Sequence, residues 1–380
     1  MNKEKIVIIG ANSFQNPLIL KAKEKGYETH VFAWESGDIG EKTADYFYPI
    51  SITEKEKILE ECKKIKPVAV ASIASDLAVI TVNYLAKELG LVGNDPKYST
   101  ICTNKYEMRK AFEKNGVNVP KFIEVSKGQK PDLSTITFPV IVKPTDRSGS
   151  RGVTKVERKE DIEKAINNAI EYSFESKAII EEFIEGNEYS CECISYNGKN
   201  HFLTITKKYT TGSPNFIETA HMQPSDLTDE EIEIVKKEIF KGLEALKIKN
   251  GPSHSEFKID KNKNVKIIEI GARMGGDCIG SDLVKISTGY DFVDLTLDVA
   301  LGKELKLEKV SVPQIAFIKF IFSKKDLDKL NYIKENHSDL IYRISEISDL
   351  EHDIVDSSTR FGYYILKVKD KKQLKELELI

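Results

Sequence analysis

The sequence of 380 residues lacks the features that mark membrane proteins and nucleic-acid-binding proteins. No apolar run approaches the roughly 18 residues that a membrane span requires. The formal net charge is only −3, and lysine and arginine are spread among aspartate and glutamate, so no basic surface for nucleic acid is indicated. The chain is also too long for one small core. We therefore predict two or three domains, with neither membrane nor nucleic acid as a partner.

Cysteine is scarce as well, with five residues: Cys62, Cys102, Cys191, Cys193 and Cys278. Their odd number and scattered positions argue against a disulfide framework. Cys191 and Cys193 alternate within a strand-like run, so their thiols share a face; a metal site there is a minor alternative to buried free thiols. The chain begins MNKEKIVIIG and enters a strand directly, without a signal-peptide pattern. We expect a cytoplasmic protein.

The first 90 or so residues alternate between strand-like and helix-like segments, which predicts a doubly wound parallel sheet. The turn after the first strand has one glycine, Gly10, where a dinucleotide fingerprint needs three, and this argues against NAD binding. The carboxyl end of that strand is still the expected edge of a ligand crevice. The residues that would touch a substrate there, although they suit a plain turn equally well, are Asn12, Ser13, Phe14 and Gln15.

The segment from His254 to Gly276 predicts a hairpin that brings two carboxylates together. Strand-like runs over 255–259 and 265–270 flank a polar turn. In that register, residues whose numbers sum to about 525 face each other, so Glu256 and Glu269 lie about 5 Å apart on one face. Facing carboxylates are a typical Mg²⁺ site when water and phosphate oxygens supply the other ligands. Taken alone, they would more often be two exposed glutamates on an ordinary hairpin.

Upstream segments contain residue types that can hold a nucleotide. An apolar strand ends at Lys143, and a loop of small residues follows at 148–153, whose backbone N–H groups can wrap an anion. The loop lacks the Gly-Lys-Ser/Thr of a P-loop and leads into no helix, so a Walker site is not predicted. Further on, a linker at Gly186 can offer backbone groups to a purine edge, and Glu188 can accept ribose hydroxyls. The alternative for the loop at 148–153 is a flexible hairpin tip, and the alternative for the linker at Gly186 is an ordinary domain connection.

In this order, the motifs make residues 1–305 resemble the ATP-grasp superfamily of ADP-forming carboxylate–amine ligases. The pattern is most similar to that of L-amino acid (dipeptide) ligases, with carbamoyl-phosphate-synthase-like and purine-pathway members nearby. The resemblance rests on the ordered set, because no single motif is diagnostic. It implies a doubly wound α/β domain (1–95), two ATP-grasp lobes (96–185 and 186–305) and a small C-terminal α+β lobe (306–380).

The resemblance also implies a set of site residues. The ATP-binding residues would be Lys105, Lys143, Ser148, Gly149, Ser150, Gly152, Val153, Glu181, Phe183, Ile184 and Glu188. Mg²⁺, replaceable by Mn²⁺, would bind Glu256 and Glu269, and the catalytic residues would be Arg273, His254 and Lys143. The substrate-binding residues, for which loop polarity is the alternative, would be Asn12, Ser13, Phe14, Asp76, Asn215, Glu218, His221, Arg273, Gly275 and Gly276.

One position departs from the pattern. Many relatives read Glu-x-Asn-x-Arg, where Asn is a third metal ligand, but this sequence has Gly271, which leaves the binding of a second Mg²⁺ open. The implied reaction converts a substrate carboxylate to an acyl phosphate and then joins it to an amine, with an amino acid as the expected donor. The expected partners are small carboxylates and amines, and a homodimer is allowed. The alternatives are a ligase with a larger acceptor (a sugar nucleotide, a carrier protein, or a carboxylase or formyl-transfer type) and a non-catalytic nucleotide-binding module.

Overall fold

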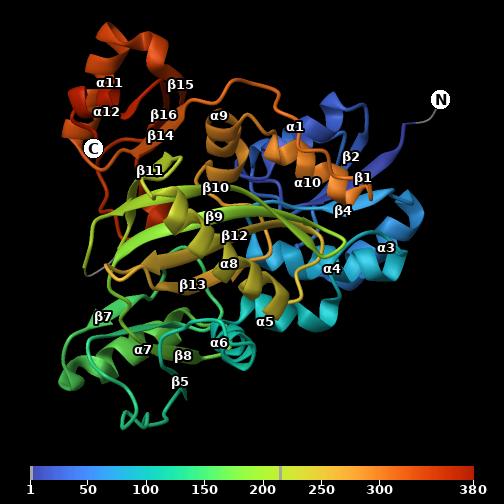
Figure 1. Cartoon of the computed structure of the whole chain (residues 1–380). Helices are drawn as coiled ribbons and strands as arrows, with labels where there is room; N and C mark the ends of the chain where they lie inside the picture. Colours follow the sequence, from blue (N-terminus) through green and yellow to red (C-terminus); the bar gives the residue numbers. More distant parts are fainter. Residues whose placement is uncertain (1–2, 214–215) are drawn as a thin grey trace.

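The N-terminal segment forms a four-stranded parallel sheet, as the alternation of elements predicts. The computed structural model describes residues 3–213 and 216–380, and this first sheet has the order β3-β2-β1-β4 (Figure 1). Its strands are β1 (Lys5–Ile9), β2 (Glu28–Phe32), β3 (Tyr46–Tyr48) and β4 (Ala69–Ala71). Its helices are α1 (Asn16–Glu24), α2 (Ile39–Thr43), α3 (Lys55–Ile65) and α4 (Asp76–Leu89). The unbroken apolar run of β1 fits its interior position, because both faces of a doubly wound sheet are covered.

The N-terminal sheet is packed against a distant part of the chain. Helix α10 (Phe292–Ala300) lies beside α1, and side chains of both helices share one core with the first strand (Figure 1). This shared core fixes the turn after β1 relative to the residues that follow Glu269.

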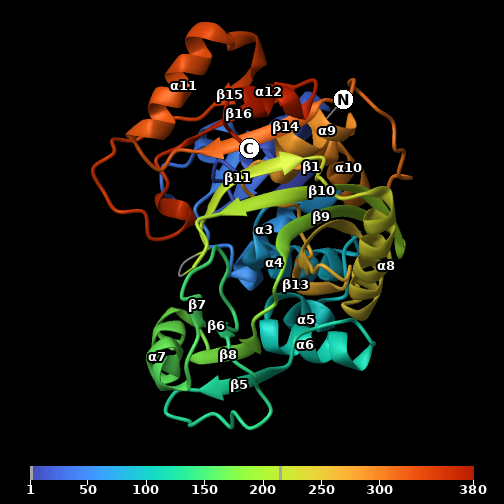
Figure 2. The same ribbon diagram turned by 60° about the vertical axis from the view of Figure 1, so that its left-hand side comes forward.

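The next segment forms an antiparallel sheet of order β5-β8-β6-β7, at the bottom of Figure 2. Its strands are β5 (Phe122–Ser126), β6 (Val140–Pro144), β7 (Thr154–Val156) and β8 (Lys177–Glu182), and its helices are α5 (Ser99–Thr103), α6 (Lys105–Lys114) and α7 (Ile162–Tyr172). The Asn104 side chain caps α6 by accepting hydrogen bonds from the N–H groups of Tyr106 (3.0 Å) and Glu107 (3.1 Å). The β6–β7 pairing is antiparallel, so the small-residue loop joins two antiparallel strands and leads into no helix.

An eight-stranded sheet of order β13-β12-β9-β10-β11-β14-β16-β15 forms the rest of the molecule. Its strands are β9 (Asn187–Tyr196), β10 (Lys199–Thr210), β11 (Glu218–Gln223), β12 (Gly251–Ile259), β13 (Val265–Gly271), β14 (Ile315–Phe320), β15 (Ile341–Ile344) and β16 (Tyr363–Val368). Its remaining helices are α8 (Asp229–Ala245), α9 (Val284–Thr288), α11 (Lys324–Asn336) and α12 (Lys371–Glu376). The pairing of β11 with β14 joins the C-terminal strands to those of the second lobe, so both contribute to one sheet.

The prediction of buried free thiols is confirmed, since all five cysteines are buried and unbonded. Cys191 and Cys193 share a face, as expected, with their Sγ atoms 3.6 Å apart. Across residues 3–213 and 216–380, the structure contains no helix whose length and apolar character would suffice to cross a bilayer.

Candidate active site

The predicted hairpin is formed by β12 and β13, and its register is confirmed. Glu256 pairs with Glu269 and His254 with Gly271, while a bulge after Glu256 shifts the remaining pairs by one residue. The two glutamate side chains are 26% and 18% exposed, so they lie at the edge of a cavity rather than in bulk solvent. In this structure each carboxylate pairs with a lysine.

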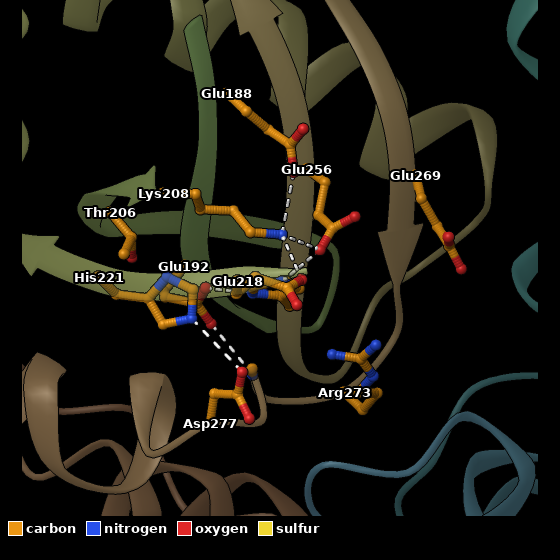
Figure 3. A network of polar contacts seen from close by, with 12 residues as sticks. Glu188, Glu192, Thr206, Lys208, Glu218, His221, Glu256, Glu269, Arg273 and Asp277 are labelled. Carbon is orange, nitrogen blue, oxygen red and sulfur yellow. Dashed lines mark hydrogen bonds and ion pairs between the residues drawn. The ribbon is translucent and has the colours of Figure 1, made fainter. Parts of the chain in front are cut away.

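Lys208 of β10 pairs with Glu256 and is surrounded by carboxylates. Its Nζ lies 2.7 Å from Glu256, 3.2 Å from Glu188 and 3.4 Å from Glu218, as the dashed lines of Figure 3 show. Burial alone would lower the pKa of Lys208, but the three carboxylates outweigh it and hold the pKa well above its usual value. Burial would in turn raise the pKa of Glu256, and chiefly Lys208 brings it well below the usual range. Both groups are therefore charged.

Lys105, the first residue of α6, pairs with Glu269. Its Nζ lies 3.0 Å from that carboxylate and donates a hydrogen bond to the carbonyl oxygen of Arg147 at 2.7 Å. The lysine thus connects the hairpin to the loop that follows β6.

Lys143 belongs to a second buried ion cluster. Glu181 Oε2 lies 2.6 Å from Lys143 Nζ, and Glu181 Oε1 lies 2.5 Å from Arg109 Nε. Burial would raise the pKa of Glu181, but Arg109 and Lys143 outweigh it and lower it to about 2. Burial lowers the pKa of Lys143 itself; Glu181 opposes this shift, and Arg109 adds to it. Glu181 therefore fixes Lys143 at the cavity wall.

The predicted purine hinge follows β8. Phe183 lies under two ammonium groups, with Lys155 Nζ at 4.3 Å and Lys258 Nζ at 4.7 Å from the ring centroid. Gly186 has φ +117°, and a Cβ there would lie 2.3 Å from the carbonyl oxygen of Ile259, so only glycine fits. Phe183, Ile184 and Glu188 line one cavity with Lys105 and Lys143.

The loop between β6 and β7 also lines this cavity. Ser148, Gly149, Ser150 and Val153 contribute to its wall, whereas Gly152 lies against Tyr172 instead. The loop also approaches the C-terminal lobe, where Arg151 Nε lies 3.9 Å from Asp356.

A second cavity, of about 900 Å³, adjoins the first. Eight residues line both, among them His254, Glu256 and Arg273. The other predicted substrate residues found in the second wall are Ser13, Phe14, Asp76, Glu218, His221 and Gly276. Asp76 and Arg273 form a two-point ion pair, with Nε–Oδ1 at 2.8 Å and Nη2–Oδ2 at 3.1 Å. Burial opposes the ionisation of Asp76, but Arg273 keeps its pKa below the usual value.

His254 is held by a carboxylate that sequence analysis missed. Its Nδ1 lies 2.5 Å from Oε1 of fully buried Glu192, and its Nε2 faces Glu256 at 3.4 Å. Burial would lower the pKa of His254, but Glu192 outweighs it and raises the pKa to about 9. The ring is thus an imidazolium at neutral pH. The Gly275 N–H donates to Glu192 Oε2 at 3.2 Å, and a Cβ on Gly275 would lie 2.7 Å from His254 Nδ1.

Four of the predicted residues that the structure describes line neither cavity: Asn12, Gln15, Gly152 and Gly275. Gln15 is buried, and its Nε2 donates a hydrogen bond to the carbonyl oxygen of Ile73 at 2.9 Å. The Asn12 side chain accepts a hydrogen bond from the N–H of Phe14 at 2.8 Å and so closes its own turn. Gly152 packs on Tyr172, and Gly275 packs on His254. Asn215 lies outside the described residues.

Other site residues went unpredicted: Arg109, Glu192, Lys208, Asp277 and Arg360. Arg109 had a signal, because it stands four positions after Lys105 and so shares a face of α6. The others sit in strands and loops whose partners are distant in sequence, and local spacing gives no sign of them.

The hairpin carboxylates fit a magnesium ion chemically, because Mg²⁺ favours carboxylate oxygens together with water and phosphate oxygens. Within residues 3–213 and 216–380 no group of three His, Cys, Asp or Glu side chains could hold a metal, so protein ligands beyond Glu256 and Glu269 are not provided by such a cluster. Crowding around position 271 explains why glycine stands there instead of asparagine. A Cβ there would lie 3.0 Å from both Arg273 Nε and Asp76 Oδ1, so a larger side chain would press on their ion pair.

Comparisons with known proteins identify similar sequences and a similar fold. Residues 136–282 match the model of the ATP-grasp domain family. The chain is 30% identical over 308 residues to an alanine–anticapsin ligase of Bacillus amyloliquefaciens, a match that covers 72% of this chain and 65% of that protein. It is 27% identical over 266 residues to a D-alanine–D-alanine ligase of Clostridium beijerinckii, covering 63% and 88%. The crystal structure of an L-amino acid ligase from Bacillus licheniformis superposes with a TM-score of 0.83 at 24% identity, covering 100% and 98% of the two chains. The chain thus spans just under two thirds of the length of the first of these relatives.

Proposed function

We propose that this chain belongs to the ATP-grasp superfamily and is an ADP-forming ligase that joins an amino acid to an amine or to a second amino acid. The observation that carries the proposal is the shared wall of the two cavities. His254, Glu256 and Arg273 line both the cavity with the lysines and hinge and the larger cavity beside it. A phosphoryl group at the end of one cavity would therefore meet a carboxylate held in the other.

In the first cavity, the purine would lie at Phe183 and Ile184, the ribose near Glu188, and the phosphates between Lys105, Lys143 and the loop at 148–153. Lys105 and Lys143 stand on the first lobe, and Glu256 and Glu269 on the second. Mg²⁺ bound to these glutamates would neutralise the phosphate oxygens and stabilise the charge that develops during transfer.

The chemistry proposed needs no nucleophilic side chain. The substrate carboxylate attacks the γ-phosphorus of ATP and displaces ADP, and the amine then attacks the acyl carbon and displaces phosphate. Arg273 and the His254 imidazolium supply fixed positive charge at the junction of the cavities, where one such donor is typically worth about 3–4 kcal/mol. Glu192 keeps His254 in place. Closure of the loop at 148–153 would keep water from the acyl phosphate.

A substrate screen tests the proposal. The full chain is incubated with ATP and Mg²⁺ and with the common amino acids singly and in pairs, and also with bicarbonate and formate; ADP, phosphate and product masses are followed. We expect ADP and phosphate in equal amounts, dependent on amino acids. Release of AMP and pyrophosphate would overturn the assignment, and turnover with bicarbonate or formate alone would favour a different carboxylate donor.

A further inference from the structure

One ion pair in the wall of the larger cavity has no role in the reaction proposed above. The C-terminal lobe supplies one of its two partners. Arg360, in the turn before β16, binds Asp277, which follows the two glycines after Arg273. Nη1 of Arg360 donates to Oδ2 at 2.9 Å and Nη2 donates to Oδ1 at 2.6 Å, and both residues line the cavity. His221 Nε2 lies 3.5 Å from the same Oδ2, and Figure 3 joins the two side chains by a dashed line.

The arginine is held rigidly. Its Nε donates to the carbonyl oxygen of Ser357 at 2.7 Å, and its guanidinium lies 3.6 Å from the ring centroid of Phe320. Only 7% of its side chain is exposed, whereas 19% of the Asp277 side chain is. The edge of the guanidinium, where both Nη atoms donate to Asp277, has the geometry that recognises a carboxylate.

Asp277 is held in an unusual backbone conformation. Its φ is +50°, and that of the next residue, Cys278, is +61°. Left-handed conformations of this kind are unfavourable for residues other than glycine. Two in succession, directly after the catalytic segment, are the kind of strain that clusters at functional sites. Asp277 lines the larger cavity in this conformation.

We propose that the Asp277–Arg360 pair is the binding site for the charged groups of the acceptor amino acid, its α-carboxylate taking Arg360 and its α-ammonium taking Asp277. An amino acid carries the same two charges as the pair. Its carboxylate can take the place of Asp277 beside Arg360, and its ammonium group can take the place of Arg360 beside Asp277, so no buried charge is left unpaired. Asp277 and Arg273 line the same cavity, so the amine would be held in the cavity that contains the group assigned to the acyl phosphate. This inference rests on the proposed ligase function and names the class of its second substrate.

A neighbouring ion pair provides a matched control. Arg343 also lies in the C-terminal lobe and binds Asp282, 2.7 Å away, on the same segment that follows β13. Neither residue is among those that line the two cavities. Arg343 Nη2 also donates to Sγ of Cys278, the residue after Asp277, at 3.1 Å. Substituting Arg343 therefore disturbs the contact between the lobe and this segment while leaving Arg360 and Asp277 themselves in place.

The test compares acceptors with and without a carboxylate. With one donor amino acid saturating, each common amino acid and its carboxamide are offered as acceptors to the full chain, and the dipeptide or dipeptide amide is measured by mass. The amide cannot be activated, so it reports on the acceptor site alone. We expect the wild type to have a KM at least about tenfold lower for acids than for amides.

Arg360→Gln should raise the KM for acids by about 10- to 100-fold and leave the KM for amides within about twofold. Arg343→Gln should leave both values within about twofold. If Arg360→Gln does not fold, Arg360→Lys keeps the positive charge but loses the two-point hydrogen bonding of the guanidinium. It should also raise the KM for acids more than the KM for amides, to a smaller degree. The wild-type comparison needs no variant at all.

Equal KM values for acids and amides in the wild type would overturn the inference. So would an equal rise for both in Arg360→Gln, since that outcome means the arginine only docks the lobe. Both results leave amino-acid-dependent ADP release intact, so they differ from failure of the proposed function, in which the wild type shows no such release.

Discussion

Replacing Glu181 by glutamine should destabilise the first lobe by several kcal/mol. The carboxylate is 3% exposed and lies between fully buried Arg109 and Lys143, which is 5% exposed. The substitution leaves two buried cations without their shared anion, which costs about 3–5 kcal/mol when one partner of a buried ion pair is removed. The difference between the ordinary pKa of 4.5 and about 2 gives a similar figure, about 3 kcal/mol.

Glu182, the next residue of β8, provides a matched control. Its side chain is 23% exposed, and its cationic neighbour Lys121 is 3.9 Å away. Glu182→Gln should therefore cost no more than about 1 kcal/mol.

Because the chain has several units, a local measurement is better than a single global unfolding transition. Hydrogen exchange on the full chain reports the free energy of opening at the amides of β6 and β8. At neutral pH, Glu181→Gln should lower their protection by roughly two to three orders of magnitude, and Glu182→Gln by less than about one. Equal effects of the two substitutions would refute the reasoning.

The pH dependence gives a second check. The folded pKa of Glu181 lies below the unfolded value, so its stabilisation is present in full above about pH 4.5 and is lost as the pH falls through about 2. The difference between the wild type and Glu181→Gln should thus be constant from pH 7 to about 5 and smaller at about pH 3.5. A difference that grows in acid would contradict the assignment.

Three further predictions concern the site. Glu269→Gln should lower ADP release by about 100-fold or more at saturating ATP, because a proposed metal ligand is lost. Glu230→Gln, which removes an exposed ion pair beside the hairpin turn, should leave ADP release unchanged. Undiminished turnover in Glu269→Gln would contradict the metal assignment. Lys208→Met should lower the free energy of opening at the amides of β10, measured by hydrogen exchange, by about 3–5 kcal/mol, because three carboxylates lose their cation. Lys207→Met, which removes a more exposed pair with Asp226, should lower it by no more than about 1 kcal/mol. Gly271→Ala should lower kcat/KM for the carboxylate about tenfold or more and leave the KM for ATP unchanged, because the alanine Cβ would press on Arg273 and Asp76. Initial rates at varied ATP and at varied carboxylate measure the two parameters separately.

The sequence was sufficient for the hairpin because its structure is decided locally. The two-residue period of the strands and the polar turn between them set the register of Glu256 and Glu269. The parallel sheet was predictable for a similar reason, since each strand and helix of the N-terminal unit has its own apolar pattern.

The charged partners in the cavities depend on strand order, which the sequence did not reveal. Lys208 is 48 residues from Glu256 and reaches it because β9 pairs with both β10 and β12. Arg360 is 83 residues from Asp277 and reaches it because β14 joins the C-terminal strands to β11. The same joining explains why the C-terminal lobe, for which sequence analysis predicted no chemistry, contributes to a cavity wall.

Each charge proposed to meet a ligand is already paired inside the protein. Glu269 has Lys105, Glu256 has Lys208, Asp76 has Arg273 and Asp277 has Arg360. Unpaired, these groups would be costly to keep partly buried. Binding of nucleotide, metal or amino acid is then an exchange of ion pairs rather than a new burial of charge, and the net gain is the difference between two similar terms. A ligand that supplies only one of the two charges would leave the other partner unpaired, so on the proposed function the cavity wall would favour zwitterions and phosphates accompanied by a cation.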